Sequence, residues 1–384
     1  MVLLLFATQA CTDIFLPGLP QIAAEFHSPI DVASLTISVY NIVQAIVVLV
    51  IGVVSDVRGR RPTLLICLAL HVAATAWIAL CGSIATMIVL RGVQALGSAA
   101  VYIVLRMIIK DTLDKQAQIH ATGLLVIGLV LSPILAPVAG GWIVHWSGWR
   151  NCFWALVIID LPLLCWAWLA VPETNRRQHA LRAAFRWRAH AGHYVAVLRT
   201  RSFLGMALIV GAGFAAFYAF ISISSFLFIR QLRLSENMYG NVFIALALAY
   251  LAGNRLMSSL NSRGWSPRNI IHLGLWGSTL GALVIGGGAL ATGHALLAAL
   301  AIVAGTCLLR WSTALIIPPA QVEVSSQHPQ HSAHALGLLT CIQYGFAAVG
   351  TMVVSTMPLA PSLSFLVSSV LFVLLSWLGY RVIR

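Results

Sequence analysis

The amino-acid sequence predicts an all-α integral membrane protein with twelve transmembrane helices in two six-helix halves. The composition, the spacing of apolar runs and the placement of basic residues support this fold class. Hydrophobic residues make up 60% of the 384 positions, charged residues make up 9%, and the mean hydropathy is +0.93. A typical soluble domain has about 25% charged residues. We therefore do not expect a water-soluble fold.

Apolar runs long enough to cross a bilayer lie on both sides of one polar segment, 172–201. A membrane-spanning helix needs about 20 apolar residues. We therefore predict an N-terminal six-helix bundle over 1–171, a cytoplasmic basic linker over 172–201, and a C-terminal six-helix bundle over 202–384. The arginines of the linker, with Phe185 and Trp187 among them, favour a helix that lies on anionic lipid. The predicted spans are 1–24, 31–54, 62–81, 84–107, 119–143, 152–171, 203–226, 238–258, 269–288, 294–316, 335–357 and 362–381.

Lysines and arginines gather in alternate loops between these spans. Cytoplasmic loops are enriched in these residues, so the alternation predicts that both termini face the cytoplasm. Only Arg150, Arg230 and Arg233 fall in loops on the other side. The net charge of +13 follows from this topology, and we expect no nucleic-acid partner. The predicted cytoplasmic set is Arg58, Arg60, Arg61, Lys110, Lys115, Arg176, Arg177, Arg182, Arg186, Arg188, Arg199, Arg201, Arg263, Arg268, Arg381 and Arg384.

The motifs of several other classes of membrane protein are missing from the sequence. The only lysines, Lys110 and Lys115, do not follow a glycine, which excludes the phosphate-binding loop of an ATP-driven pump. Neither HExxH nor GxSxG occurs, so we expect no enzyme activity. His328, His331 and His334 share a loop without a cysteine or a close carboxylate, which favours a solvated loop over a metal site. The seven cysteines are scattered and predict packing residues.

One short segment recurs about half a chain later. Arg58–Pro62 (RGRRP) joins the predicted second and third spans, and Arg263–Pro267 (RGWSP) takes the same place in the second half. The glycine and proline of each copy predict a tight turn. Because the match is in register with the layout of spans, it indicates that the halves are repeats of one unit.

The loop after the second span contains an aspartate and glycines in addition to the arginines expected of a cytoplasmic loop. The segment Gly52–Pro62 reads GVVSDVRGRRP. Glycine permits the turn, and an aspartate at a helix end can pair with arginines or cap a neighbouring helix. The segment resembles the loop between helices two and three of the major facilitator superfamily, which implies a gate on the cytoplasmic side. The alternative, that the arginines are only positive-inside anchors, leaves the aspartate and the glycines unexplained. The candidate gate residues are Gly52, Asp56, Arg58, Gly59, Arg60 and Arg61.

Two charged residues of the first half are predicted to lie within the membrane. Thr12–Pro20 (TDIFLPGLP) and Leu90–Gly97 (LRGVQALG) resemble segments of the drug–proton antiporters in the bicyclomycin-resistance branch of that superfamily. The resemblance implies that Asp13 and Arg91 take part in proton coupling. A charge at the centre of a span costs about 2.5 to 3.5 kcal/mol, so it is rarely idle. Alternatively, Asp13 caps a break near Pro17 and Arg91 reaches the outer interface.

The predicted fifth span has small residues and a proline at the spacing of that branch's antiporter helix. Ser132 and Ala136 stand where the motif usually has glycine, and both are small enough for close helix packing and a proline bend. The candidate residues of this helix are Gly123, Ser132, Pro137, Gly140 and Gly141.

Two further charges within spans, Asp160 and Arg310, fall outside the pattern of the branch. We group Asp160 with the proton-coupling residues and Arg310 with the substrate cavity; alternatively, they pair with each other or with the backbone. Aromatic residues of the seventh span would suit an apolar pocket, although aromatic side chains that face lipid are as common. The predicted cavity residues are Tyr40, Asn41, Phe217, Tyr218, Arg310 and Gln343.

The resemblance implies a secondary transporter of the bacterial inner membrane that exports small, largely apolar drugs or toxic compounds in exchange for protons. The rival hypothesis is a proton-coupled exporter of one endogenous metabolite, such as a siderophore, a peptide or an amino-acid derivative. Either transporter uses the proton gradient without a cofactor or metal. Its expected partners are a small-molecule substrate, protons and lipid, and its expected state is a monomer.

Overall fold

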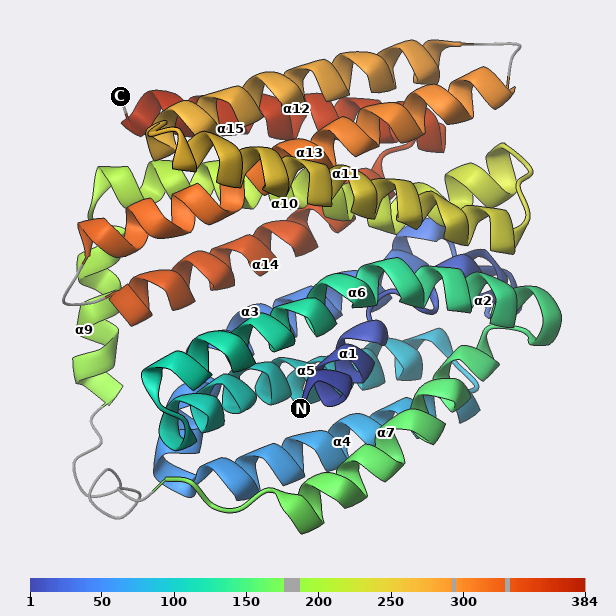
Figure 1. Cartoon of the computed structure of the whole chain (residues 1–384). Helices are drawn as coiled ribbons and strands as arrows, with labels where there is room; N and C mark the ends of the chain where they lie inside the picture. The colour runs from blue at the N-terminus through green and yellow to red at the C-terminus, as the bar shows by residue number, and fades with distance from the viewer. Residues whose placement is uncertain (176–186, 292–294, 329–331, 384) are drawn as a thin grey trace. The chain divides into compact units, whose positions relative to one another are not determined.

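The computed structural model describes residues 1–175, 187–291, 295–328 and 332–383, and every regular element in these ranges is a helix (Figure 1). Ten of the described helices are long and apolar enough to cross a membrane. The broken first span and the 33-residue helix α6 supply the other two of the predicted twelve. The elements are α1 (Val2–Ala10), η1 (Leu16–Gly18), α2 (Leu19–Glu25), α3 (Ile30–Arg58), α4 (Arg60–Leu80), α5 (Ile84–Thr112), α6 (Lys115–Ser147), α7 (Arg150–Ala170), α9 (Trp187–Leu198), α10 (Arg201–Ser225), η2 (Phe226–Gln231), α11 (Glu236–Ser262), α12 (Pro267–Leu290), α13 (Ala295–Gln327), α14 (Ser332–Thr356) and α15 (Pro361–Ile383).

The first span, predicted as one helix over 1–24, is interrupted in the structure. It has α-helix at both ends, with a turn and the short helix η1 between them. Pro17 and Pro20 account for the break, because proline has no N–H to donate to the carbonyl four residues earlier. The carbonyl of Asp13 instead accepts a hydrogen bond from the N–H of Leu16 at 3.2 Å. The predicted first span therefore consists of two helical parts, with the break near Pro17 that the alternative role of Asp13 supposes.

The tenth span is longer than predicted. We expected it to end at 316, ahead of Pro318 and Pro319, whereas α13 continues through both prolines to Gln327. Away from water the freed carbonyls gain nothing from unfolding the helix, so the remaining helical hydrogen bonds hold it together. The predicted span is thus the first part of a longer helix.

The two recurring turns have the same unusual backbone. Gly59, between α3 and α4, has a φ of +105°, and Gly264, between α11 and α12, has a φ of +82°. A side chain at such a φ is strained, so glycine is the residue that suits both turns. Each following helix has a proline within its first turn, where a missing N–H costs little. The predicted tight turns are confirmed.

The chain divides into two compact units. Unit 1 comprises Met1–Arg186 with Glu236–Gly240, and unit 2 comprises Trp187–Ser235 with Asn241–Arg384. Within unit 1, α5 packs against α3 and α4, α4 against α7, and α1 against α6. Within unit 2, α10 packs against α14 and α15, and α12 against α13. Much of the predicted basic linker, at 176–186, lies outside the described residues, and α9 follows it (Figure 1).

Both units carry large apolar side chains on their surfaces. In unit 1, Trp146, Ile158 and Leu169 expose 77%, 71% and 87% of their area, and in unit 2 Leu283 and Leu296 expose 69% and 70%. A water-soluble protein rarely exposes so many large apolar residues, whereas lipid accommodates them. The chain is a multi-pass membrane protein.

Candidate functional site

A buried arginine organises the candidate site of unit 1. Arg91, on α5, is 0% exposed. Its guanidinium donates hydrogen bonds to the carbonyl of Cys11 at 2.9 Å, to the carbonyl of Thr36 at 3.3 Å and to Oε1 of Gln94 at 2.5 Å. Cys11 lies in the break of the first span, so the arginine supplies a charged donor where the helix has been interrupted. The side chain of Arg91 is therefore held inside the bundle.

Two aromatic rings flank the same guanidinium. The central carbon of Arg91 lies 4.4 Å from the ring centroids of both Phe15 and Tyr40. A desolvated cation–π contact is worth about 2 kcal/mol. The hydroxyl of Tyr40 contacts Oγ of Ser98 at 2.5 Å and Sγ of Cys11 at 3.2 Å. Tyr40, predicted to line a substrate cavity, is 0% exposed and packs against the arginine.

Asp13 lies in the turn between α1 and η1, with 9% of its surface exposed. Its charge acts on the guanidinium of Arg91 and on the thiol of Cys11. Desolvation favours a neutral carboxyl group, whereas a nearby arginine favours the carboxylate. The structure therefore brings together the two residues that the sequence assigned to proton coupling, Asp13 and Arg91.

A second buried pair lies beside this arrangement. His71 on α4 and Asp160 on α7 are both 0% exposed, and Nε2 of His71 is 3.3 Å from Oδ2 of Asp160. Nδ1 of His71 is 3.1 Å from the main-chain oxygen of Gln94, the residue whose side chain accepts from Arg91. The charge of Asp160 also acts on Cys11. The third predicted proton-coupling residue thus lies beside His71, which Gln94 connects to Arg91.

Helix α6 packs against the break of the first span. A Cβ atom on Gly140 would overlap the backbone of Ile14, so glycine allows this approach. Ser132 is 0% exposed, and its hydroxyl has no hydrogen-bond partner among the described residues. Pro137 lies inside α6, as does Pro133. The other predicted residues of this helix, Gly123 and Gly141, fall within the same element.

Two of the predicted gate residues, Asp56 and Arg60, form an ion-pair network with Asp111 at one end of unit 1. Arg60 contacts Asp56 at 2.6 Å and Asp111 at 3.0 Å. Glu173 accepts hydrogen bonds from the main-chain N–H groups of Arg60, at 3.0 Å, and Arg61, at 3.2 Å. An acidic side chain at these donors caps the N-terminus of α4 and complements its dipole. The network joins the ends of α3, α4 and α5 to the segment after α7.

The remaining gate residues support the same end of unit 1. The guanidinium of Arg61 donates to the carbonyl of Trp168 at 2.8 Å, and the side-chain amide of Asn175 donates to the carbonyl of Asp56 at 2.8 Å. Arg58 is the last residue of α3, where Gly52 also lies. Because Asp56 is paired and Glu173 caps a helix, positive-inside anchoring does not account for the whole motif.

An aromatic cluster in unit 2 surrounds the predicted cavity arginine. The central carbon of Arg310 lies 3.9 Å from the ring centroid of Phe217 and 4.8 Å from that of Tyr250. Phe214 packs against Tyr218, with 5.0 Å between ring centroids, and against Tyr344, with 5.7 Å.

Only part of the aromatic stripe of the seventh span belongs to that cluster. Phe220 is 0% exposed and packs against Phe228, Phe243 and Phe365 in the core of unit 2. Of the other predicted cavity residues, Gln343 on α14 is half-buried. Asn41 on α3 is 0% exposed, and neither atom of its amide has a hydrogen-bond partner among the described residues.

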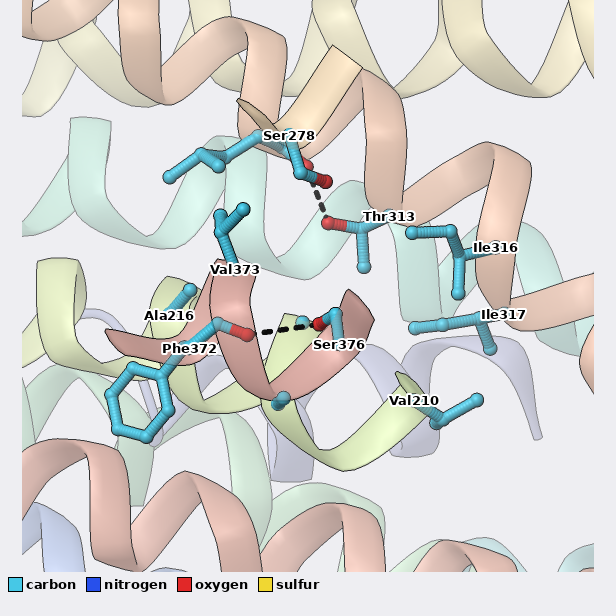
Figure 2. Close-up of a pocket in the computed structure, with 12 residues that line it drawn as sticks. Val210, Ala216, Ser278, Thr313, Ile316, Ile317, Phe372, Val373 and Ser376 are labelled. Carbon is cyan, nitrogen blue, oxygen red and sulfur yellow. Dashed lines mark hydrogen bonds between the residues drawn. The ribbon is translucent and has the colours of Figure 1, made fainter. Parts of the chain in front are cut away.

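A small cavity in unit 2 lies between α10, α12, α13 and α15, and none of the predicted cavity residues lines it (Figure 2). Its polar lining consists of Ser278, Thr313 and Ser376. Each of these hydroxyls donates to a carbonyl of its own helix, at 3.0, 2.6 and 3.0 Å. With these donors satisfied, the cavity offers a ligand little beyond apolar contact, and we assign no substrate to it.

The three histidines predicted to share a loop do not do so, because His334 lies in the first turn of α14 while His328 follows the last residue of α13. The described histidines have ordinary neighbours. Nε2 of His328 is 3.3 Å from Oγ1 of Thr200, and the ring of His334 packs against that of Tyr194, with 5.3 Å between centroids. His331 lies outside the described residues.

Comparison with known families identifies the chain. The family model described as "Major Facilitator Superfamily" matches residues 1–351. The chain belongs to this superfamily of transporters. The predicted fold class, an all-α membrane protein of the major facilitator fold, is confirmed.

Curated relatives within the superfamily include transporters of drugs and of unassigned substrates. The multidrug transporter MdfA of Yersinia pestis bv. Antiqua (strain Angola) is 27% identical over 298 residues, which cover 77% of this chain and 72% of MdfA. The uncharacterized MFS-type transporter YdgK of Bacillus subtilis (strain 168) is 27% identical over 244 residues, covering 63% of this chain and 60% of YdgK.

Solved structures share the fold at low sequence identity. The nucleoside transporter NupG matches with a TM-score of 0.77 and 13% identity, covering 100% of this chain and 99% of NupG. A D-xylose–proton symporter matches with a TM-score of 0.72 and 15% identity, covering 98% of this chain and 95% of the symporter. At these identities the likeness concerns the major facilitator fold alone.

Sequence reasoning missed three residues that hold these sites together. His71 is an ionisable residue inside a predicted span, which is itself a signal of function. Gln94 falls within the quoted segment around Arg91. It contacts both Arg91 and His71, and the contact with His71 depends on the packing of α4 against α5. Glu173 follows the sixth span, and nothing in its local sequence indicates that it caps α4.

Proposed function

We propose that this member of the major facilitator superfamily exports small, largely apolar drugs or toxic compounds in exchange for protons. The observation that carries the proposal is the placement of Asp13 in the break of the first span, two residues from the carbonyl of Cys11 that accepts a hydrogen bond from Arg91. The likeness to the multidrug transporter MdfA supports drugs as the class of substrate. The motifs quoted above resemble those of the bicyclomycin-resistance branch, and this resemblance supports proton exchange.

In this mechanism the proton and the substrate bind in alternation. When Asp13 is ionised, it neutralises Arg91, and when it is protonated, the arginine keeps an uncompensated positive charge near the carbonyl of Cys11. That change of charge favours a different arrangement of the first span around its break. Export follows if one protonation state of Asp13 favours a transporter open to the cytoplasm and the other favours a transporter open to the outside.

The ion-pair network around Arg60 then acts on the cytoplasmic side. Both termini would face the cytoplasm of a bacterium, which puts the turn at Gly59 inside the cell. Opening toward the cytoplasm would require the ends of α3, α4 and α5 to move together, because Asp56, Arg60 and Asp111 connect them. The protein would work as a monomer with no cofactor other than the proton gradient.

A single endogenous metabolite is the second candidate substrate. Arg310 stacks on Phe217 and Tyr250 within one aromatic cluster. A guanidinium held in this way would suit a substrate with both an apolar body and an anionic group, such as an amino-acid derivative.

Proton release from acid-loaded inside-out vesicles tests the proposal. Lipophilic cations, neutral dyes and amino-acid derivatives are added separately to vesicles that contain the wild-type chain, Asp13→Asn or the control Asp31→Asn, whose aspartate lies in the first turn of α3. We expect at least one compound to collapse the pH gradient in wild type and control, and Asp13→Asn to abolish the response while still binding the compound. Full gradient-driven transport by Asp13→Asn removes this residue from the mechanism, and stimulation only by amino-acid derivatives selects the second candidate.

A further inference from the structure

The contact between His71 and Asp160 requires a proton. Nδ1 of His71 is 3.1 Å from the main-chain oxygen of Gln94, and since a carbonyl can only accept, Nδ1 carries a hydrogen. In the neutral imidazole Nε2 would then be an acceptor, and it faces Oδ2 of Asp160 at 3.3 Å. Two acceptors repel each other at this distance. One proton therefore belongs to the pair, on Nε2 or on the carboxyl group.

Because His71 and Asp160 are buried, loss of their proton would leave a negative charge without water around it. Both side chains are 0% exposed. Nε2 and Oδ2 are not aligned as a hydrogen bond, and neither oxygen of Asp160 has a hydrogen-bond partner among the described residues. With the proton the pair has no net charge, whereas without it a poorly solvated carboxylate remains. Such a state is unfavourable unless a positive group lies nearby.

Gln94 connects the pair to that positive group. Its main chain faces His71, its Oε1 accepts from Arg91 at 2.5 Å, and its Nε2 donates to Oγ1 of Thr75 at 2.8 Å. Thr75 in turn donates to the carbonyl of His71 at 2.6 Å. Gly97 allows the close approach of α5 to α4, because a Cβ there would lie 2.5 Å from Cβ of His71. A change of charge on the pair is therefore transmitted to Arg91 through one residue.

Other titratable groups lie on α4, α7 and the elements packed against them. Their charges influence how readily the proton leaves. Arg91 is a cation that favours release, and Asp13 opposes release when it is ionised. Besides those at the helix ends, the described groups include Cys67 on α4, Cys152 and Cys165 on α7, Arg91 and Tyr102 on α5, Tyr40 on α3, and Cys11 and Asp13 in the break of the first span.

We propose that His71 and Asp160 form a second proton-binding site, coupled to Arg91 through Gln94. The proposal rests on the proton-coupled transport proposed above. On release, the N–H bond at Nε2 or the O–H bond of the carboxyl group breaks, and the proton passes to water. A neutral imidazole and a carboxylate are left. The new negative charge attracts the guanidinium of Arg91. Because Arg91 donates a hydrogen bond to the carbonyl of Cys11, loss of the proton from the pair affects the break of the first span, which also contains Asp13.

A spectroscopic titration of the wild-type chain tests the protonation without any substrate. The full chain, with ¹⁵N-labelled histidine, is reconstituted in lipid and followed by solid-state NMR from acid to alkaline pH, with His71→Gln to assign the signal. We expect Nδ1 of His71 to stay protonated throughout, while Nε2 or the Asp160 carboxyl, read by infrared absorption, loses one proton. A His71 with unprotonated Nδ1, or a pair that never exchanges its proton, overturns the proposal.

Proton stoichiometry tests the coupling. Proteoliposomes with the full chain receive tetraphenylphosphonium, a lipophilic cation, and the pH gradient at which its net flux reverses gives the protons exchanged per probe. We expect Asp160→Asn and His71→Gln to lose about one proton per probe, because the proposed site needs both side chains to hold its proton. The control His272→Gln replaces a histidine that stacks on Tyr380 in unit 2, and it should match wild type.

The two proposals fail in different ways. An unchanged stoichiometry in folded Asp160→Asn overturns the second site and leaves proton-coupled export standing. A wild-type chain whose probe flux ignores the pH gradient overturns proton-coupled export. In that case the second site is rejected as a coupling element, and the NMR titration still reports on the protonation of the pair.

Discussion

Alanine at Gly140 should loosen unit 1 by a predictable amount. The added Cβ would overlap the main chain of Ile14, which cannot rotate away as a side chain would. Overpacking costs about 1–3 kcal/mol, and alanine recovers up to about 1 kcal/mol through its helix propensity. Because the overlap is with the main chain, we take the upper end of the overpacking cost, about 2–3 kcal/mol, which leaves a net loss of about 1–2 kcal/mol. For a unit of this size that lowers the unfolding midpoint by about 2–8 °C.

Buried thiols provide the assay for this change. Cys11 and Cys152 in unit 1 are both 0% exposed, so they react with a fluorogenic thiol reagent only when the unit opens. The background carries serine at Cys165, Cys307 and Cys341, which are exposed or half-buried. The temperature at which the purified protein in detergent begins to react gives the midpoint.

The control for this experiment is Gly345→Ala on α14. A Cβ at Gly345 would meet nothing within 4 Å, so the substitution should leave the midpoint unchanged or raise it slightly. Equal unfolding midpoints for the two variants would refute the reasoning. The overlap with Ile14 would then contribute nothing, and only the helix propensity of alanine, which both variants gain, would affect stability. A loss for Gly140→Ala with full transport would show that the contact serves stability alone.

Three further predictions concern charged groups of unit 1. Arg91→Lys should lower transport about tenfold or more in a folded protein, because lysine keeps the charge but lacks the planar group that donates to several acceptors at once; rates in proteoliposomes measure this. Hydrogen bonds from Arg150 and Trp149 hold the pKa of Glu25, just beyond the predicted first span, below its ordinary value of 4.5 against the opposing effect of burial. Glu25 therefore contributes stability that is complete above about pH 4.5 and is lost as the pH falls through its lowered pKa. The midpoints of wild type and Glu25→Gln should differ at neutral pH and converge in acid, and a constant difference would contradict the assignment. Glu173→Gln removes the charge at the N-terminus of α4 and should cost about 0.3–1 kcal/mol, measured by the same thiol assay and weakened by added salt.

The sequence predicted the fold because apolar length and basic-loop placement act over whole segments. It also predicted the two turns, since Gly59 and Gly264 have a local requirement for a left-handed backbone. The break of the first span was considered only as the alternative role of Asp13, because its prolines lie inside an otherwise apolar run. The full length of α13 could not be read from the apolar run, because Pro318 and Pro319 do not stop a helix that packs within unit 2.

The site was predictable only in part. Asp13 and Arg91 stand out as charges within spans, and the family resemblance gave them a role. Their partners depend on tertiary contacts: His71 meets Asp160 because α4 packs on α7, and Glu173 reaches the N-terminus of α4 from the segment after α7. A linear pattern contains no information on which helices cross at a given depth. The stacking of Arg310 on Phe217 and Tyr250 was likewise beyond reach.

The proline pair of α13 gives this helix an internal joint. Pro318 and Pro319 have no N–H groups to donate to the carbonyls of Ala314 and Leu315. Two consecutive backbone hydrogen bonds of the helix are therefore absent. The stretch that ends at Gln327 can therefore swing relative to the stretch before the joint without breaking any existing backbone hydrogen bond. A transporter that changes shape in each cycle gains from such a joint, because bending there needs no local unfolding.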